Sequence, residues 1–289
     1  MTVTHPSNQD VVWPLLHPAL LEKVLVECQP HRKILAYAAA ATVNCLHPAH
    51  AGRAMELVAS RQVVILLLQR CLSFQSADES DPAFEWISIL FRVLIARHHT
   101  PDLYRNLNAS LVSTLWAKLT PEQMLLLRMV DMVVAEPSSP ATTDHGPDAA
   151  LVEFFCTEFT ALHAPPVTSE PDEDAAPSSD RQAMWDVMEI ESSKRMFHIL
   201  GTLTSTPATL DDAKVLPFIA ALVGQLRRFT TTHTRETNAA ALSSEPVDED
   251  EAFGYRSAGV RVLGNMAHRS TSVQEALRAC GGLEILLNR

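Results

Sequence analysis

The sequence predicts an all-α fold, and three observations lead to that prediction. Hydrophobic residues make up 47% of the 289 positions and are mostly Ala, Leu and Val, whereas glycine occurs only 9 times. This composition favours helix over strand. Apolar residues also recur at helical spacing along almost the whole chain. Finally, proline or a capping residue precedes several of these apolar stretches, as expected at helix starts.

Taken in order, the apolar stretches predict a succession of helices. The second contains the Ala-rich run 36–41, whose small side chains let neighbouring helices approach closely. Asp81-Pro82 precedes the fourth stretch, and Thr120 with Pro121 opens the sixth, where a capping side chain is followed by proline in the first turn. The predicted helices span 19–26, 31–45, 54–72, 84–97, 103–119, 121–135, 149–162, 180–203, 210–230, 253–268 and 272–288.

Three stretches interrupt the helical pattern. Residues 136–148 are rich in Pro, Ser and Thr, residues 164–179 are acidic and Pro-rich, and residues 233–251 end in an acidic run. Low hydrophobicity combined with charge or proline is typical of flexible connections. Because these stretches separate helices of similar character, we interpret them as loops within a single helical-repeat domain spanning 1–289.

An internal similarity indicates that the helices form repeats. When residues 37–68 are aligned with 258–287, Asn44 lies opposite Asn265, and Ile65 lies opposite Leu286. In both segments a helix of small and branched residues ends near the Asn, a polar turn follows, and a second helix ends in an apolar run. Recurring helix pairs of this length predict an α-solenoid.

The charge and the cysteines restrict the partners and the compartment. A net charge of −11 argues against a nucleic-acid surface and against binding to anionic membranes. The longest strongly apolar run, 63–68, is far shorter than the ~20 residues that a membrane span needs. The N-terminus has no features of a signal peptide. The five cysteines are scattered, as in proteins of reducing compartments, so we expect a cytoplasmic protein.

The C-terminal region 253–289 contains three blocks of residues that together resemble a known domain. These blocks are residues 260–266 (Val-Arg-Val-Leu-Gly-Asn-Met), 273–275 (Val-Gln-Glu) and 281–283 (Gly-Gly-Leu). In order and spacing they resemble the C-terminal domain of the ataxin-10 family. The resemblance implies an armadillo-like fold and a non-enzymatic scaffold acting in cytokinesis. In the family an Asn-Pro-Phe segment follows this apolar stretch, whereas this sequence stops at Arg289, so we expect either a truncated version of the domain or a fragment of a longer sequence.

Each motif residue suggests a structural or partner-binding role. A glycine inside a helix, such as Gly264, is expected where helices pack closely, and Asn265 is expected to bond backbone groups of a neighbouring turn or repeat. Gly281 and Gly282 supply the positive φ needed between two helical segments. Arg261 is expected either to face a partner or to cover the helix surface. The motif residues that we single out are Arg261, Gly264, Asn265, Gln274, Gly281 and Gly282.

The sequence contains no pattern that predicts a catalytic, cofactor or metal site. His47 and His50 are three residues apart, but they lie beside Pro48 in a turn with no nearby Cys or carboxylate. His98 and His99 end a predicted helix, where imidazole suits the negative end of the helix dipole. We therefore expect no enzyme activity and no cofactor.

Three functions remain open at this stage. The first is a scaffold that binds one or more protein partners, or a second copy of the chain. The second is a regulatory or chaperone-like subunit of a larger complex. The third is a helical enzyme with an unfamiliar site, which requires several polar groups that converge in one apolar pocket.

Overall fold

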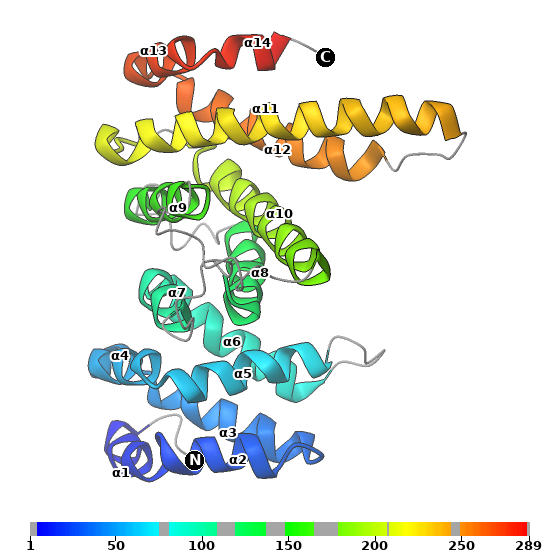
Figure 1. Cartoon of the computed structure of the whole chain (residues 1–289). Coiled ribbons are helices and arrows are strands. Elements are labelled where there is room, and N and C mark those ends of the chain that lie inside the picture. Colours follow the sequence, from blue (N-terminus) through cyan, green and yellow to red (C-terminus); the bar gives the residue numbers. More distant parts are fainter. Residues whose placement is uncertain are drawn as a thin grey trace, which may run out of the picture. The chain divides into compact units, whose positions relative to one another are not determined.

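A computed structural model describes residues 5–74, 81–108, 119–136, 148–164, 179–206, 208–243 and 249–287. Within these ranges every regular element is a helix and no strand occurs, which confirms the all-α fold class (Figure 1). The contacts divide the chain into two compact units, 1–133 and 134–289. Each unit has its own hydrophobic core and is described separately below.

Among its described residues, the first unit contains seven complete α-helices and most of an eighth. Each early helix contacts the helix three places later: α2 packs on α5, α3 on α6 and α4 on α7, while α1 bonds to α4 through side chains. The packing in this unit therefore has a three-helix period. The elements are α1 (Pro6–Leu16), α2 (Ala19–Glu27), α3 (Arg32–Cys45), the 3₁₀ turn η1 (Pro48–His50), α4 (Ala51–Ala59), α5 (Arg61–Phe74), α6 (Pro82–Ala96), α7 (Thr100–Asn108) and α8 (Pro121–Ala135).

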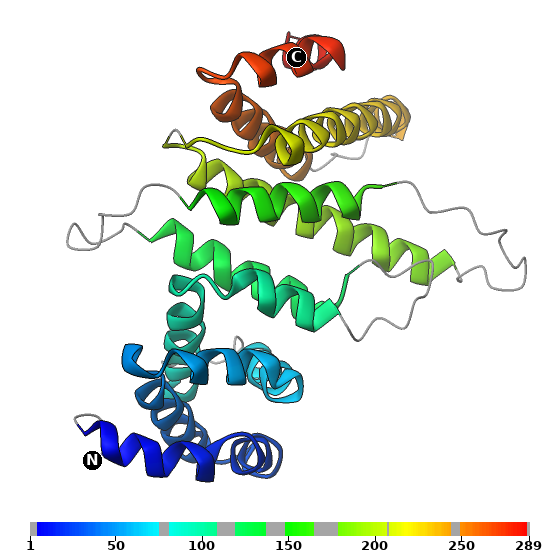
Figure 2. The same ribbon diagram turned by 90° about the vertical axis from the view of Figure 1, so that its left-hand side faces the viewer.

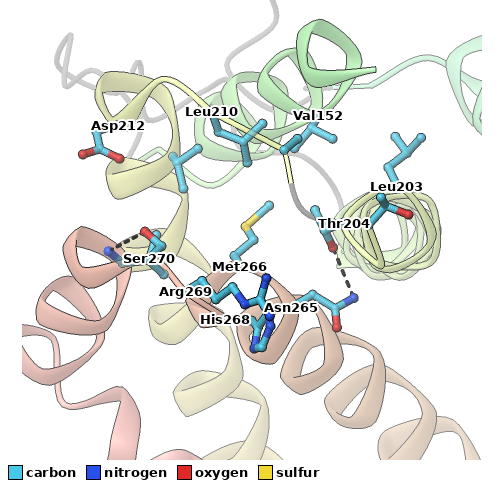
Figure 3. Close-up of a pocket in the computed structure, with 14 residues that line it drawn as sticks. Val152, Leu203, Thr204, Leu210, Asp212, Asn265, Met266, His268, Arg269 and Ser270 are labelled. Carbon is cyan, nitrogen blue, oxygen red and sulfur yellow. Dashed lines mark hydrogen bonds between the residues drawn. The ribbon is translucent and has the colours of Figure 1, made fainter. Parts of the chain in front are cut away.

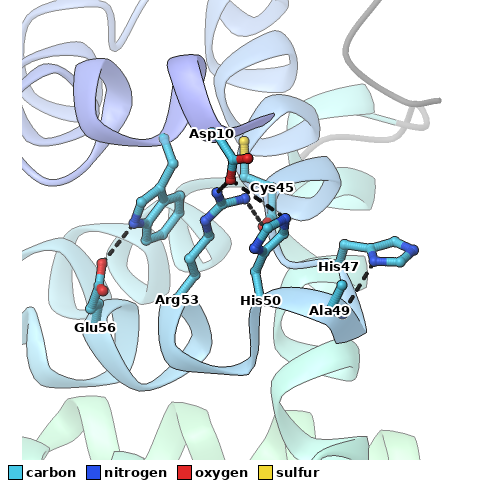
Figure 4. A network of polar contacts seen from close by, with 8 residues as sticks. Asp10, Cys45, His47, Ala49, His50, Arg53 and Glu56 are labelled. Atoms are coloured by element: carbon cyan, nitrogen blue, oxygen red, sulfur yellow. Dashed lines mark hydrogen bonds and ion pairs between the residues drawn. The ribbon is translucent and has the colours of Figure 1, made fainter. Parts of the chain in front are cut away.

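Three polar contacts fix the register of α4 against α1. The indole nitrogen of Trp13 donates to Glu56 Oε2 over 2.7 Å. Figure 4 shows the Arg53 guanidinium reaching from α4 to the Asp10 carboxylate on α1. His17 Nε2 lies 2.9 Å from the Ser60 hydroxyl. The partners are 43 residues apart in all three pairs, so the two helices run in the same direction in constant register.

The predicted start of α6 is confirmed in detail. The Asp81 side chain accepts a 2.8 Å hydrogen bond from the backbone nitrogen of Ala83, and Pro82 occupies the first turn. Asp81 also pairs with Arg32 over 3.1 Å, so the cap of α6 contacts the start of α3.

Cys71, in the neighbouring α5, is buried, and this burial raises the pKa of its thiol to about 12. Cys71 therefore packs as a small hydrophobic residue.

In the second unit, each helix contacts the helix two places later. α9 packs on α11, α10 on α12, and α11 on α13 (Figures 1 and 2). Lys214 Nζ bonds Glu153 Oε2 over 2.6 Å, and the Gln225 amide lies 2.7 Å from His163 Nδ1, at separations of 61 and 62 residues. This nearly constant offset means that α9 and α11 run in the same direction. The elements are α9 (Ala149–Leu162), α10 (Ser179–Leu203), α11 (Asp212–Ser243), α12 (Glu249–Ala267), α13 (Thr271–Ala279) and α14 (Gly282–Leu287).

An aromatic cluster joins four successive helices in the core of this unit. The ring centroid of Phe159 in α9 lies 5.2 Å from that of Phe197 in α10 and 5.2 Å from that of Phe218 in α11. The Phe197 ring contacts the Tyr255 ring of α12 at 5.1 Å. Such tilted and edge-on pairs stabilise beyond the area that they bury. Phe159 therefore forms the centre of the second core.

The same helix–turn–helix motif occurs in both units. α6 and α7 are joined by a three-residue turn, as are α12 and α13, and the second helix has nine residues in each case. The middle residue of each turn, His98 or Arg269, has a φ of 62°. A left-handed residue just after a helix is a common way to end it. α3 and α4 show a longer form of this connection that includes η1, so the predicted similarity between 37–68 and 258–287 extends to the order of their helices.

Three sequence-based boundaries were wrong. The predicted helix 54–72 is two helices, because the chain breaks at Ser60, whose hydroxyl donates to the carbonyl oxygen of Glu56 and contacts His17. The predicted helix 272–288 is likewise split, at Gly281. The predicted loop 233–251 is largely helical, since α11 continues to Ser243 and α12 begins at Glu249. The alanines at 239–241 are strong helix formers, which favours continuation of the helix in spite of the polar residues around them.

Some predictions lie outside the described residues. Most of the predicted loops 136–148 and 164–179 falls there, as does the second half of the predicted helix 103–119. Among the helices that are described, none combines the length and the apolar character needed to cross a bilayer.

Candidate functional site

The motif residues of the C-terminal region lie along α12, α13 and the start of α14. The amide nitrogen of Asn265 donates to the carbonyl oxygen of Gly201 over 3.0 Å and to the Thr204 hydroxyl over 3.3 Å, which ties α12 to the end of α10. Gln274 donates to the carbonyl oxygen of Ala267 over 2.9 Å, which ties α13 to the end of α12. Both amides therefore bind backbone groups at the end of a neighbouring helix, as the sequence predicted for Asn265.

Arg261 lies on the surface of α12 and covers Gly201 of α10. A Cβ at Gly201 would lie 3.5 Å from Cδ and Nε of Arg261, so the arginine stem packs against a helix that has no side chain at this point. The side chain of Arg261 is exposed beyond this contact. Its placement agrees with a residue that covers the helix surface.

Two of the three motif glycines, Gly264 and Gly282, have roles different from those predicted, and Gly281 has the predicted one. Gly264 is exposed, and a Cβ there would have no atom within 4 Å, so close packing does not explain it and that prediction was wrong. The close approach occurs five residues earlier, at Gly259, where a Cβ would lie 3.0 Å from Leu226 Cδ2. Gly281 has a φ of +70°, as predicted for the segment between α13 and α14. Gly282 has no positive φ and instead packs against Leu277.

A small pocket opens beside Asn265, and its volume is about 160 Å³. Figure 3 shows it between α9, the connection from α10 to α11, and the turn from α12 to α13. The side chain of Met266 points into it. Small-molecule sites usually measure about 300–1,000 Å³, so this pocket is too small for a typical organic cofactor. Its apolar floor consists of Val152, Leu203, Leu210, Val215, Met266 and Val273.

The rim of this pocket is polar and uneven in charge. On one side lies Asp212, whose carboxylate accepts a 3.0 Å hydrogen bond from the Ser272 hydroxyl. His268 and Arg269 lie on the opposite side, next to Asn265 (Figure 3). No sequence pattern marks His268 or Arg269 as site residues, because only the fold brings the α12–α13 turn to the α10–α11 connection.

A second polar cluster surrounds His163 at the end of α9. His163 Nε2 lies 2.9 Å from the Ser193 hydroxyl, and Nδ1 lies 2.9 Å from Glu189 Oε1. The Gln225 amide contacts the same Nδ1. Burial raises the pKa of the Tyr255 phenol next to this cluster, and its hydrogen bond with Ser193 partly opposes the rise. The histidine lies between a serine on one ring nitrogen and a carboxylate on the other, which is the arrangement of contacts found in hydrolytic triads.

The geometry of this cluster does not suit a nucleophile. The Ser193 hydroxyl donates its one proton to the carbonyl oxygen of Glu189 over 2.7 Å, so His163 must donate to Ser193 instead of accepting from it. A serine nucleophile requires the opposite direction. Ser193 is also fully buried, at 0% exposure, and only 3% of the His163 side chain is exposed. The cluster therefore satisfies buried polar groups between α9, α10 and α11.

His47 and His50 are not brought together as a metal pair. His47 Nδ1 accepts a 3.2 Å hydrogen bond from the Ala49 nitrogen, and its ring points away from His50 (Figure 4). The sequence analysis found no carboxylate near His50, but the fold places Asp10 Oδ1 3.6 Å from His50 Nε2. Within the described ranges, no three His, Cys, Asp or Glu side chains form a group suited to a metal ion.

The chain matches no family model, and comparison with curated proteins and with solved structures gives no match either. The resemblance to ataxin-10 proteins therefore rests on the motif residues described above.

We predict opposite effects for two alanine substitutions in α12. Gly264→Ala should raise the free energy of unfolding by about 0.5–1 kcal/mol, because Ala favours helix and the site is open. Gly259→Ala should lower it by about 1–2 kcal/mol, because the new methyl group meets Leu226 and Leu222. Urea unfolding of both variants measures the difference. Changes of the same sign would contradict this assignment of the two glycines.

Ser193 should behave as a structural residue. A fluorophosphonate probe, which labels activated serines, should leave Ser193 unmodified in the native protein, while trypsin labelled in parallel provides the positive control. Ser193→Ala should lower the free energy of unfolding by about 1–2 kcal/mol, because His163 loses its acceptor. Probe attachment at Ser193, detected by peptide mass spectrometry, would show that a nucleophile was missed.

Proposed function

We propose that this protein is a non-enzymatic scaffold of armadillo-like helical repeats that binds a protein partner. The three-helix period of the first unit supports the proposal, because α1 and α4 repeat at 43 residues, within the ~40–47 residues of HEAT and armadillo repeats. The parallel packing of α9 on α11 and of α10 on α12 extends the same principle to the second unit. Stacked repeats of this kind commonly present extended binding surfaces.

The ataxin-10 resemblance forms part of this proposal. Asn265 ties α12 to α10, Gln274 ties α13 to α12, and Gly281 forms the left-handed turn between α13 and α14. Each of the three therefore has a physical reason to be part of a motif. The resemblance implies a cytoplasmic scaffold whose partner belongs to the cytokinesis machinery.

The observation that carries the proposal is a set of exposed apolar side chains on α3 and α6. These two helices pack against each other in the first unit. On α3, Tyr37 is 73% exposed and Ile34 is 44% exposed, and on α6, Ile89 is 37% exposed. Large apolar side chains on adjacent exposed helices are typical of surfaces that bind proteins. We call these three residues the α3–α6 face.

The polar clusters also favour a scaffold over an enzyme. In the group formed by His163, Ser193 and Glu189, the serine and the imidazole are buried, and the hydrogen bonds run in the wrong direction for a nucleophile. The pocket beside Asn265 is smaller than a typical substrate site and does not include that group. Catalysis requires polar groups that converge on an accessible reacting atom.

Substitutions on the α3–α6 face test the proposal. The double variant Tyr37→Glu with Ile89→Glu should reduce recovery of the main co-purifying protein by at least about tenfold, because losing two apolar anchors costs at least about 1.4 kcal/mol of binding free energy. The matched control is Met55→Glu on α4, since Met55 is 61% exposed in the same unit. Quantitative affinity purification with mass spectrometry measures the recovery.

The control variant should retain the partner at the wild-type level, with both variants showing the wild-type thermal midpoint. Equal recovery by the double variant and by the wild-type protein would contradict a role for the α3–α6 face in binding.

A further inference from the structure

The pocket beside Asn265 matches the size of one large side chain. Its volume of about 160 Å³ is close to that of an engineered cavity of ~150 Å³ that binds benzene. The aliphatic residues of the floor make about half of the lining apolar, the rest being polar, and Met266 adds a flexible thioether that adapts to different shapes. A leucine or phenylalanine side chain is the group that such a pocket accommodates best.

The rim adds a charge that has no partner. Arg269 and His268 are both exposed, and among the residues that the structure describes neither side chain makes a hydrogen bond or an ion pair. Asp212, across the pocket, is already bonded to Ser272. A bound segment would therefore meet a cation without a partner on the Arg269 side, and on the other side the Asp212 carboxylate, which is already hydrogen-bonded. A carboxylate of the ligand would therefore contribute most to the binding free energy when it pairs with Arg269.

The turn between α12 and α13 does not by itself require this cation. Arg269 has a φ of 62°, a conformation that glycine or asparagine adopts more easily than arginine. The equivalent position in the α6–α7 turn is His98, also at 62°, so the turn forms with a different side chain. The turn thus tolerates an arginine at this position without requiring it, and the geometry of the turn places Arg269 at the pocket rim.

We propose that the pocket beside Asn265 is an anchor site for a partner segment that carries one leucine or phenylalanine flanked by acidic residues. The apolar side chain enters between Met266 and Val215, and an adjacent carboxylate pairs with Arg269. Central anchors that fill a pocket, with charged pairs at the rim, are the usual arrangement of a binding hot spot. The proposal rests on the scaffold function, and it adds a second contact site with a defined ligand chemistry.

Three synthetic hexapeptides test the anchor site on the full chain. The first is Ser-Asp-Phe-Asp-Gly-Ser, the second replaces its Phe with Ala, and the third replaces both Asp with Lys. Methyl NMR of the protein should show shifts at Met266, Val215 and Val273 with the first peptide. The other two should bind at least about fivefold more weakly, because each lacks one of the two proposed contacts.

Matched variants separate this site from other surfaces. Arg269→Glu should weaken binding of the first peptide at least about fivefold. Arg278 is an exposed arginine on α13 outside the pocket, so Arg278→Glu should change the affinity for the first peptide by less than about twofold. Ala208→Trp fills the pocket from its edge and should abolish the shifts while the thermal midpoint stays unchanged.

Absence of shifts with the first peptide, or equal binding of all three peptides, would overturn the anchor site. Equal effects of Arg269→Glu and Arg278→Glu would overturn the role of Arg269. Failure of the scaffold proposal can be distinguished from failure of the anchor site, because the peptide experiment uses purified protein without a partner. The Tyr37→Glu and Ile89→Glu double variant should bind the first peptide with wild-type affinity.

Discussion

The guanidinium of Arg53 is the constraint on which the first unit depends. Arg53 is only 8% exposed, and its nitrogens donate to the carbonyl oxygen of Cys45 and to the Asp10 carboxylate. Its charge also lies 6.0 Å from the centroid of the Trp13 ring. A buried cation is stable only when its donors are satisfied, so α1, α3 and α4 must meet in one register. That register places α3 where α6 can pack on it, and so positions the exposed face that we propose binds a partner.

The second unit uses the same principle with different side chains. Long polar side chains from one helix bond the free carbonyl groups at the end of another: Asn265 bonds Gly201, Arg227 bonds Cys280 over 3.1 Å, and Arg256 bonds Ile285 over 2.8 Å. The last carbonyls of a helix have no partner within it, so each bond satisfies a group that would otherwise need water. These bonds tie α10 and α14 to α12, and α13 to α11, and the pocket beside Asn265 forms where α9, the α10–α11 connection and the α12–α13 turn meet.

The helical class and most helix positions followed from local patterns, because periodicity and capping residues such as Asp81 act within a few positions of the sequence. Gly281 and Asn265 were also predictable, since their roles depend on a local φ and on a side chain that reaches a neighbouring backbone. The break at Ser60 was missed because its contact with His17 spans 43 residues. For the same reason the pocket cation Arg269 and the His163 cluster gave no local signal. Gly264 and Gly259 look alike in sequence, and only the position of Leu226 distinguishes them.

A double-mutant cycle between Asp10 and Arg53 tests the central claim that the contact of the buried Arg53 guanidinium with the Asp10 carboxylate sets the register of the repeats. The substitutions are Asp10→Asn and Arg53→Met, each measured alone and together by urea unfolding. We expect a coupling energy of about 1–3 kcal/mol, because these residues contact each other where Arg53 is buried. The exposed pair of Lys23 and Glu27 serves as a control and should couple by less than about 0.5 kcal/mol. Additive effects of the two substitutions at Asp10 and Arg53 would contradict the account.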